Sequence, residues 1–172
     1  MNTILIGMKA CGKSTVGRLL AKKLKIKFLE LDQEIEKVHL LNKKDNITFR
    51  EIFKKHGVDY FRQLESIALE QISKEKKTNE FVLSCGGGTP LDEKNRIIIK
   101  KLGRVIFLDA DEDVLFQRIT KHGIPAFFPY PNDLKKSLRE LLEKRRPIYN
   151  MIADKIISFE NESPEELVEK II

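Results

Sequence analysis

Residues 7–15 read GMKACGKST, which fits the phosphate-loop pattern G-x-x-x-x-G-K-[ST]. Gly7 and Gly12 let the backbone curve around a phosphate group with its N–H groups turned inward. Lys13 places a positive charge between the two outer phosphates, and the hydroxyl of Ser14 is suited to Mg²⁺. The motif predicts a nucleoside triphosphate site with Mg²⁺. Its nucleotide contacts are assigned to Gly7, Ala10, Cys11, Gly12, Lys13, Ser14 and Thr15.

The sequence on either side of this loop has the order that such a site requires. Residues 3–6 are an apolar run typical of a buried strand, and Val16, Leu20 and Leu24 recur at helical spacing after the loop. Four further apolar runs alternate with helical segments: 28–31, 81–85, 105–108 and 155–159. This alternation predicts an α/β fold of three layers, in which a five-stranded parallel sheet lies between helices.

Two capping boxes mark helix starts. Thr48 with Glu51, and Ser163 with Glu166, each place a hydroxyl residue three positions before a glutamate. We expect the helix that begins near Thr48 to end at Gly57 and another helix to follow it.

The length of the chain predicts one domain, residues 1–172. We also expect a monomer. The chain has a net charge of +6, but its lysines are interleaved with acidic residues and few aromatic residues accompany them, so no nucleic-acid partner is expected. No apolar run reaches the roughly 18 residues of a membrane span. The first predicted strand begins at Thr3, so no signal peptide is expected, and Cys11 and Cys85 are predicted to be free thiols. These features indicate a cytoplasmic protein.

Two carboxylates stand at the end of the run 28–31, at the sheet edge where ligands of parallel sheets bind. Glu30 or Asp32 could hold Mg²⁺ through water or accept a hydrogen bond from a substrate hydroxyl. The alternative is that Asp32 only caps the helix that follows it. Spacing alone does not decide between the two interpretations.

The run 81–85 is followed by three glycines, Gly86, Gly87 and Gly88. Glycines allow a ligand to approach the backbone closely, and their position at a strand end favours this interpretation over a flexible turn.

Several arginines could grip a carboxylate or a phosphate, although most arginines are merely solvated. The candidates are Arg62, Arg118, Arg145 and Arg146. The three histidines, His39, His56 and His122, show no metal-ligand spacing, so we interpret them as surface or loop residues.

Together these motifs resemble the shikimate kinase family over nearly the whole chain. The family pattern F-x-D-x-D-x-x-I-E is matched by residues 28–36 (FLELDQEIE). An E-I-F segment at 51–53 precedes G-x-x-x-F-R-x-x-E, matched by residues 57–65 (GVDYFRQLE). The triple glycine and residues 145–149 (RRPIY) match the family's G-G-G loop and its R-x-P-L-Y motif.

The resemblance implies a P-loop kinase fold like that of nucleoside monophosphate kinases, with a substrate-binding segment at 33–61 and a lid at 121–133. It implies ATP-dependent phosphorylation of a ring hydroxyl of shikimate, which gives shikimate 3-phosphate and ADP. Asp32 would bind and orient the attacking hydroxyl, and Lys13 would neutralise charge on the phosphoryl group. Arg62 and Arg145 would clamp the substrate carboxylate, and Arg118 would lie against the adenine. The resemblance also implies substrate contacts from Gly86, Gly87 and Gly88, and Mg²⁺ contacts from Ser14 and Glu30.

Two positions depart from the family pattern. Glu30 stands where the family usually has aspartate, and Ile124 stands where the lid usually has the arginine that reaches the phosphates. Lys121 or His122 could substitute for that arginine.

Two other functions remain as alternatives. One is a related kinase that phosphorylates gluconate or a nucleoside monophosphate, although paired arginines favour a carboxylate acceptor. The other is a regulatory protein that uses ATP as a switch.

Overall fold

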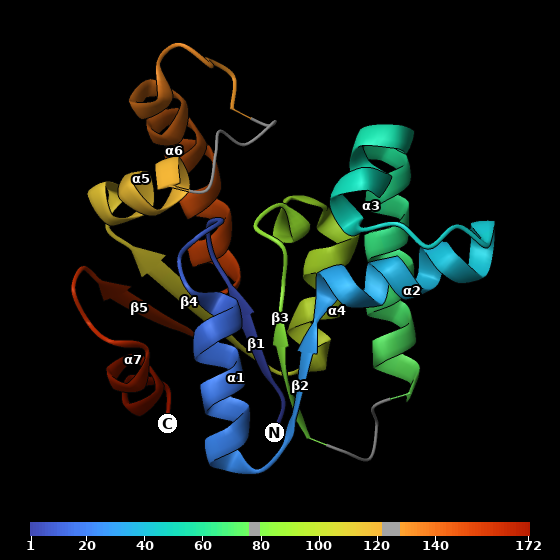
Figure 1. The fold of residues 1–172 in the computed structure, drawn as a ribbon. Coiled ribbons are helices and arrows are strands. Elements are labelled where there is room, and N and C mark those ends of the chain that lie inside the picture. Colours follow the sequence, from blue (N-terminus) through green and yellow to red (C-terminus); the bar gives the residue numbers. More distant parts are fainter. Residues whose placement is uncertain (76–79, 122–127) are drawn as a thin grey trace.

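Five strands form one parallel sheet in the computed structural model (Figure 1), which describes residues 1–75, 80–121 and 128–172. The strands are β1 (Thr3–Ile6), β2 (Lys27–Glu30), β3 (Phe81–Ser84), β4 (Arg104–Ala110) and β5 (Lys155–Phe159). Their order in the sheet is β2-β3-β1-β4-β5, and every neighbouring pair is parallel. The predicted five-stranded parallel sheet is confirmed.

Helices cover both faces of the sheet, so the predicted three layers are also confirmed (Figure 1). The helices are α1 (Lys13–Leu24), α2 (Leu31–Lys43), α3 (Phe49–Glu75), α4 (Glu93–Leu102), α5 (Glu112–Lys121), α6 (Leu134–Ile152) and α7 (Pro164–Ile171), with a short 3₁₀ helix η1 (Thr89–Leu91). α1 and α7 lie side by side on one face, whereas α4 and α6 lie on the other. α2 and α3 pack together beside the β2 edge of the sheet.

The core is centred on β1 and β3, in which every residue is buried. Strands covered by helices on both faces need apolar side chains on both faces, which explains their continuous rather than alternating apolar runs. The central position of β1 places the loop that follows it in the middle of the carboxyl edge of the sheet.

The segment 33–61, predicted to bind substrate, consists of most of α2, a connection at 44–48 and the first part of α3. The predicted capping box is present, since the Thr48 amide donates to Oε2 of Glu51 over 2.8 Å and the Glu51 amide donates to Oγ1 of Thr48 over 3.4 Å. Gly57, with φ 82° and ψ 176°, breaks α3 into two helical parts. The predicted helix end at Gly57 is therefore confirmed. The positive φ at this position explains why the residue is glycine.

One prediction about the histidines is wrong. His39 is neither at the surface nor in a loop, because it lies in α2 with an exposed fraction of 0%. Its position on the helix face that packs against α3 buries it, which spacing along the sequence did not reveal. His56 is half-buried in α3, and His122 lies outside the described residues.

Two further expectations concern the cysteines and the membrane. Cys11 and Cys85 are buried free thiols, as predicted. Among the residues that the structure describes, no helix combines the length and the apolar character needed to cross a bilayer.

Candidate functional site

The loop between β1 and α1 has the backbone of a phosphate-binding loop. Gly7 (φ 144°), Ala10 (φ 67°) and Gly12 (φ 98°) all have positive φ. A Cβ on Gly7 would lie 2.6 Å from the carbonyl oxygen of Leu108, so only glycine fits there. Gly12 occupies the N-cap of α1 without a side-chain cap, which leaves first-turn N–H groups available to an anion.

Two side chains that follow the loop, those of Lys13 and Ser14, lie beside it. Nζ of Lys13, 8% exposed, donates to the carbonyl oxygens of Gly7 (3.0 Å) and Met8 (2.8 Å), so its charge is held against the loop. Oγ of Ser14 donates to Oε1 of Glu30 over 2.8 Å. Thr15, the next residue of α1, is exposed. The structure thus brings together the two residues that were predicted to bind Mg²⁺.

Neither carboxylate at the end of β2 caps α2 with its side chain. Glu30 stands at the N-cap of α2, without a side-chain capping bond, and Asp32 lies inside the first turn. The alternative that Asp32 only caps the helix is therefore wrong. Burial, followed by the nearby charges of Glu30 and Glu65, raises the pKa of Asp32 to about 6. A carboxylate with such a pKa can act as a general base near neutral pH.

The three glycines after β3 lie against three different predicted groups. A Cβ on Gly86 would lie 3.7 Å from Oδ1 of Asp32, and one on Gly87 would lie 3.6 Å from Nη1 of Arg145. A Cβ on Gly88 would lie 2.9 Å from Cζ of Arg62. The glycine loop thus brings together all the residues predicted to bind the acceptor.

Arg62 is held by a buried carboxylate that the sequence analysis gave no role. Glu65, with an exposed fraction of 1%, pairs with Arg62 and accepts a hydrogen bond of 2.7 Å from Oγ1 of Thr89. Burial raises the pKa of Glu65, and Arg62 opposes this shift. The spacing of three residues on one helix was a signal for this pair.

Arg145 and a second overlooked residue, Tyr149, extend from α6 toward the same loop. Arg145 is 9% exposed, and its Nη1 lies 3.8 Å from Sδ of Met8 in the phosphate loop. The hydroxyl of the fully buried Tyr149 donates to the carbonyl oxygen of Gly87. Burial raises the pKa of Tyr149 to about 12, so it remains a neutral donor at physiological pH. Both residues belong to the motif at 145–149, and their spacing of four places them on one face of α6.

The other two candidate arginines, Arg118 and Arg146, contact different parts of the chain. Nη1 of Arg118, in α5, donates to the carbonyl oxygen of Ala10 over 3.3 Å. Nε of Arg146 donates to Oδ1 of Asp109 over 2.9 Å, so Arg146 does not join the acceptor set. A cavity of about 450 Å³ opens beside this pair, within the size range of small-molecule sites. Its lining consists of Asp109, Asp111, Arg146, Ser158, Phe159, Glu160, Asn161 and Glu162, and includes the turn that leads to α7.

A family model described as "Shikimate kinase" matches residues 9–172. The chain belongs to the shikimate kinase family. Two curated relatives named shikimate kinase support this assignment. The relative from Alkaliphilus oremlandii is 36% identical over 99% of this chain and 96% of its own length. The relative from Persephonella marina is 37% identical over 99% of this chain and 96% of its own length.

Solved structures agree with the shikimate kinase assignment. The shikimate kinase from Acinetobacter baumannii in complex with shikimate has a TM-score of 0.85 and 32% identity, with 99% of this chain and 89% of that chain covered. The enzyme from Aquifex aeolicus has a TM-score of 0.77 and 33% identity, with 99% and 93% covered. Shikimate kinases use ATP as the phosphate donor, with Mg²⁺ as the usual metal ion.

The predicted lid of this shikimate kinase family member, 121–133, is only partly described. Lys121 is the exposed last residue of α5, and residues 122–127 lie outside the described residues. Ile124, where the sequence departs from the family pattern, is one of these residues. Phe128 is buried, and Asp133 caps α6 by accepting a hydrogen bond of 3.0 Å from the Lys136 amide.

Proposed function

We propose that the protein transfers the γ-phosphoryl group of ATP to a ring hydroxyl of shikimate, giving shikimate 3-phosphate and ADP. The observation that supports this most strongly is the arrangement of the glycine loop. Successive glycines lie against Asp32, Arg145 and Arg62, and Gly87 also lies against the phosphate loop. A carboxylate acceptor held by the two arginines would thus be adjacent both to a base and to the phosphates.

The nucleotide half of the proposed site binds anionic groups. The uncapped first turn of α1 would receive the phosphates, and Lys13 would neutralise charge on the transferred group. Arg118, which donates to Ala10, would lie along the nucleotide on the α5 side. The cavity at the ends of β4 and β5 has room for the adenine.

The hydroxyl of Ser14 and the carboxylate of Glu30 fit Mg²⁺, which prefers oxygen ligands. Glu30 has one more methylene than the aspartate usual in the family, but its carboxylate still reaches Ser14. Mg²⁺ supplies electrostatic stabilisation of charge on the phosphates.

In the acceptor half of the proposed site, each group has a separate role. Arg62 and Arg145 would bind the carboxylate of shikimate bidentately, and Glu65 orients Arg62. Asp32, ionised above about pH 6, would accept the proton of the attacking hydroxyl. Backbone groups of Gly86, Gly87 and Gly88 would form the wall against the ring, since no side chain intervenes.

We also propose the oligomeric state, the location and the partners of the protein. The protein acts as a monomer, in the cytoplasm, and without a nucleic-acid partner. Support for the last comes from composition, in which 32 basic residues are interleaved with 26 acidic ones. Steeply salt-dependent binding of an oligonucleotide would instead favour the regulatory alternative.

The experiment is a measurement of ADP release with ATP and Mg²⁺, comparing shikimate, gluconate and a panel of nucleoside monophosphates. We expect turnover with shikimate and none with the other acceptors. Lys13→Ala is the matched control, because it should abolish turnover if ADP comes from this site. Turnover with another acceptor and not with shikimate would refute the proposed substrate while leaving the kinase fold in place.

A further inference from the structure

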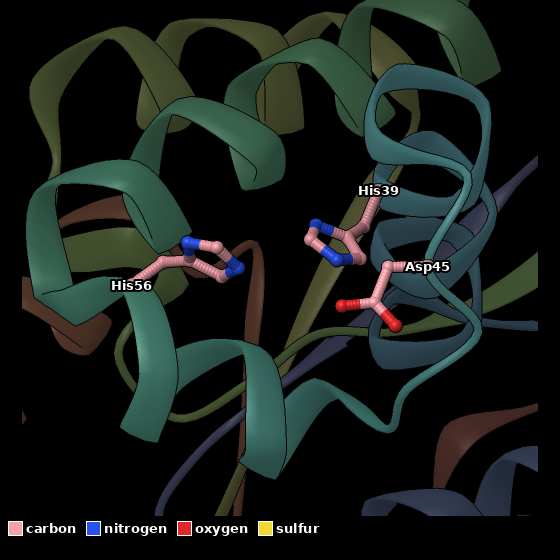
Figure 2. A group of neighbouring side chains, drawn as sticks. All are labelled: His39, Asp45 and His56. Carbon is pink, nitrogen blue, oxygen red and sulfur yellow. The ribbon is translucent and has the colours of Figure 1, made fainter.

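Two histidines and an aspartate meet where α2 packs against the first part of α3 (Figure 2). His39 comes from α2, Asp45 from the connection at 44–48, and His56 from α3 just before Gly57. One potential ligand atom from each side chain lies within 4.8 Å of the others. In Figure 2 the two imidazole rings and the carboxylate point into a shared space. None of the three belongs to the ATP or acceptor sites proposed above.

The two imidazoles have unused nitrogen atoms. Nε2 of His39 and Nε2 of His56 are buried, and neither has a hydrogen-bond partner in the part of the chain that the structure describes. Buried polar atoms in folded proteins are normally paired, so an unpaired one requires an explanation. Two such atoms on neighbouring rings, whose centroids are 5.3 Å apart, indicate a missing shared partner.

The other nitrogen of His39 is already engaged. Its Nδ1 lies 3.0 Å from the hydroxyl of Tyr60. In the tautomer whose Nδ1 donates to Tyr60, Nε2 presents its lone pair to the shared space. Metal-binding histidines typically use their second nitrogen in this way, which fixes the ring orientation.

The charges around the cluster are mixed. Nζ of Lys55 donates to Oδ2 of Asp45 over 2.7 Å, which leaves the lone pairs of Oδ1 for a ligand. Lys43 lies 6.0 Å from the ring centre of Tyr60 and adds a second positive charge nearby. Both lysines oppose a bound cation, and Lys55 does so most directly.

We propose that His39, Asp45 and His56 bind one divalent transition-metal ion, with Zn²⁺ as the representative. Two imidazoles and a carboxylate suit Zn²⁺, and imidazole ligands disfavour Mg²⁺. Tetrahedral Zn²⁺ with bonds near 2.1 Å sets its ligand atoms about 3.4 Å apart, so the three side chains close inward on binding. Asp45 can move most easily, because its segment is neither helix nor strand. The bound ion would cross-link α2, which contains Asp32, to the first part of α3.

The experiment is titration of the untagged full chain with Zn²⁺, without nucleotide, by isothermal calorimetry and by competition with a chromophoric chelator. We expect one ion per chain and a higher melting temperature with Zn²⁺. His56→Gln and Asp45→Asn should each weaken binding at least about tenfold, which is the lower end of the loss seen for even an outer-shell partner. Both residues are less buried than His39, so these variants avoid a substitution at a fully buried position.

The matched control is Asp113→Asn, the same chemical change at an exposed position of α5. It should leave Zn²⁺ affinity unchanged. Lys55→Met removes the opposing charge and should tighten binding, a result that a purely structural role would not give. Zn²⁺ affinity that is equal in the wild-type chain, His56→Gln and Asp45→Asn would overturn the proposal, as would a Lys55→Met chain that binds no more tightly.

Discussion

A methyl group added at Gly88 should disable the acceptor site through one contact. The three heavy atoms nearest to a Cβ at this position all belong to the guanidinium group of Arg62, with Cζ at 2.9 Å and Nη1 at 3.0 Å. Gly88 has φ −91° and ψ −14°, which alanine adopts without strain, so Gly88→Ala perturbs Arg62 rather than the backbone. The guanidinium group must shift away from the carboxylate that it is proposed to bind.

The expected magnitude follows from the interaction that is lost. A hydrogen bond to a charged group contributes about 1.5–3 kcal/mol, which corresponds to a loss of about tenfold to 150-fold in kcat/KM for shikimate. The KM for ATP should change little. Steady-state kinetics with each substrate varied in turn measures both effects.

A double-mutant cycle isolates the cause. In an Arg62→Ala background the clashing atoms are absent, so Gly88→Ala should have almost no further effect. An equal loss in both backgrounds, or an equal rise in the KM values of shikimate and ATP, would refute the argument.

Other predictions follow from pKa shifts and from hydrogen bonding. Because the pKa of Asp32 is about 6, kcat/KM for the acceptor should fall below that pH, and Glu30→Gln, at saturating MgATP, should move this limb to lower pH. An unmoved limb in a pH-rate profile would contradict the proposed influence of Glu30. The raised pKa also means that ionised Asp32 disfavours folding above its unfolded pKa of 3.8, so Asp32→Asn should stabilise the chain at pH 7 by up to about 3 kcal/mol. Urea denaturation should show this gain shrinking toward pH 4, and a constant gain would contradict the assignment. Tyr149→Phe removes the donor to the Gly87 carbonyl and should destabilise the fold by about 1–3 kcal/mol in the same assay, whereas no loss would show that the carbonyl finds another donor.

The sheet and the phosphate loop could be predicted from the sequence because local patterns determine both. The run at 3–6 is apolar throughout, and the loop after it requires glycine at Gly7, where the Leu108 carbonyl leaves no room for a side chain. Parallel strands then bring their carboxyl ends to one edge, so residues that follow different strands meet without further information.

Contacts between helices were harder to predict. His39 and His56 are 17 positions apart, and they meet only because α2 and α3 pack together at a particular angle and register. No local pattern in the sequence encodes that packing. Both histidines were therefore interpreted as surface or loop residues, because their spacing along the sequence is not that of metal ligands. The pairing of Glu65 with Arg62 was easier to predict, because the two residues lie one helical turn apart. Its burial, however, depends on Thr89 from another part of the chain.

Gly86, Gly87 and Gly88 pack closely against other parts of the chain. Gly86, Gly87 and Gly88 are not among the described residues with positive φ, so their backbone conformation alone does not require glycine. Space does require it. A Cβ on Gly87 would lie 3.2 Å from the Gly7 carbonyl oxygen, 3.3 Å from the Lys9 amide and 3.6 Å from Arg145. A side chain at Gly87 would require the Gly7 carbonyl and the Lys9 amide to give way by a few tenths of an ångström, whereas Arg145 would be at ordinary van der Waals distance. The missing side chain therefore allows the glycine loop to approach closely the loop that is proposed to bind ATP, and phosphoryl transfer requires the two substrates to be close together.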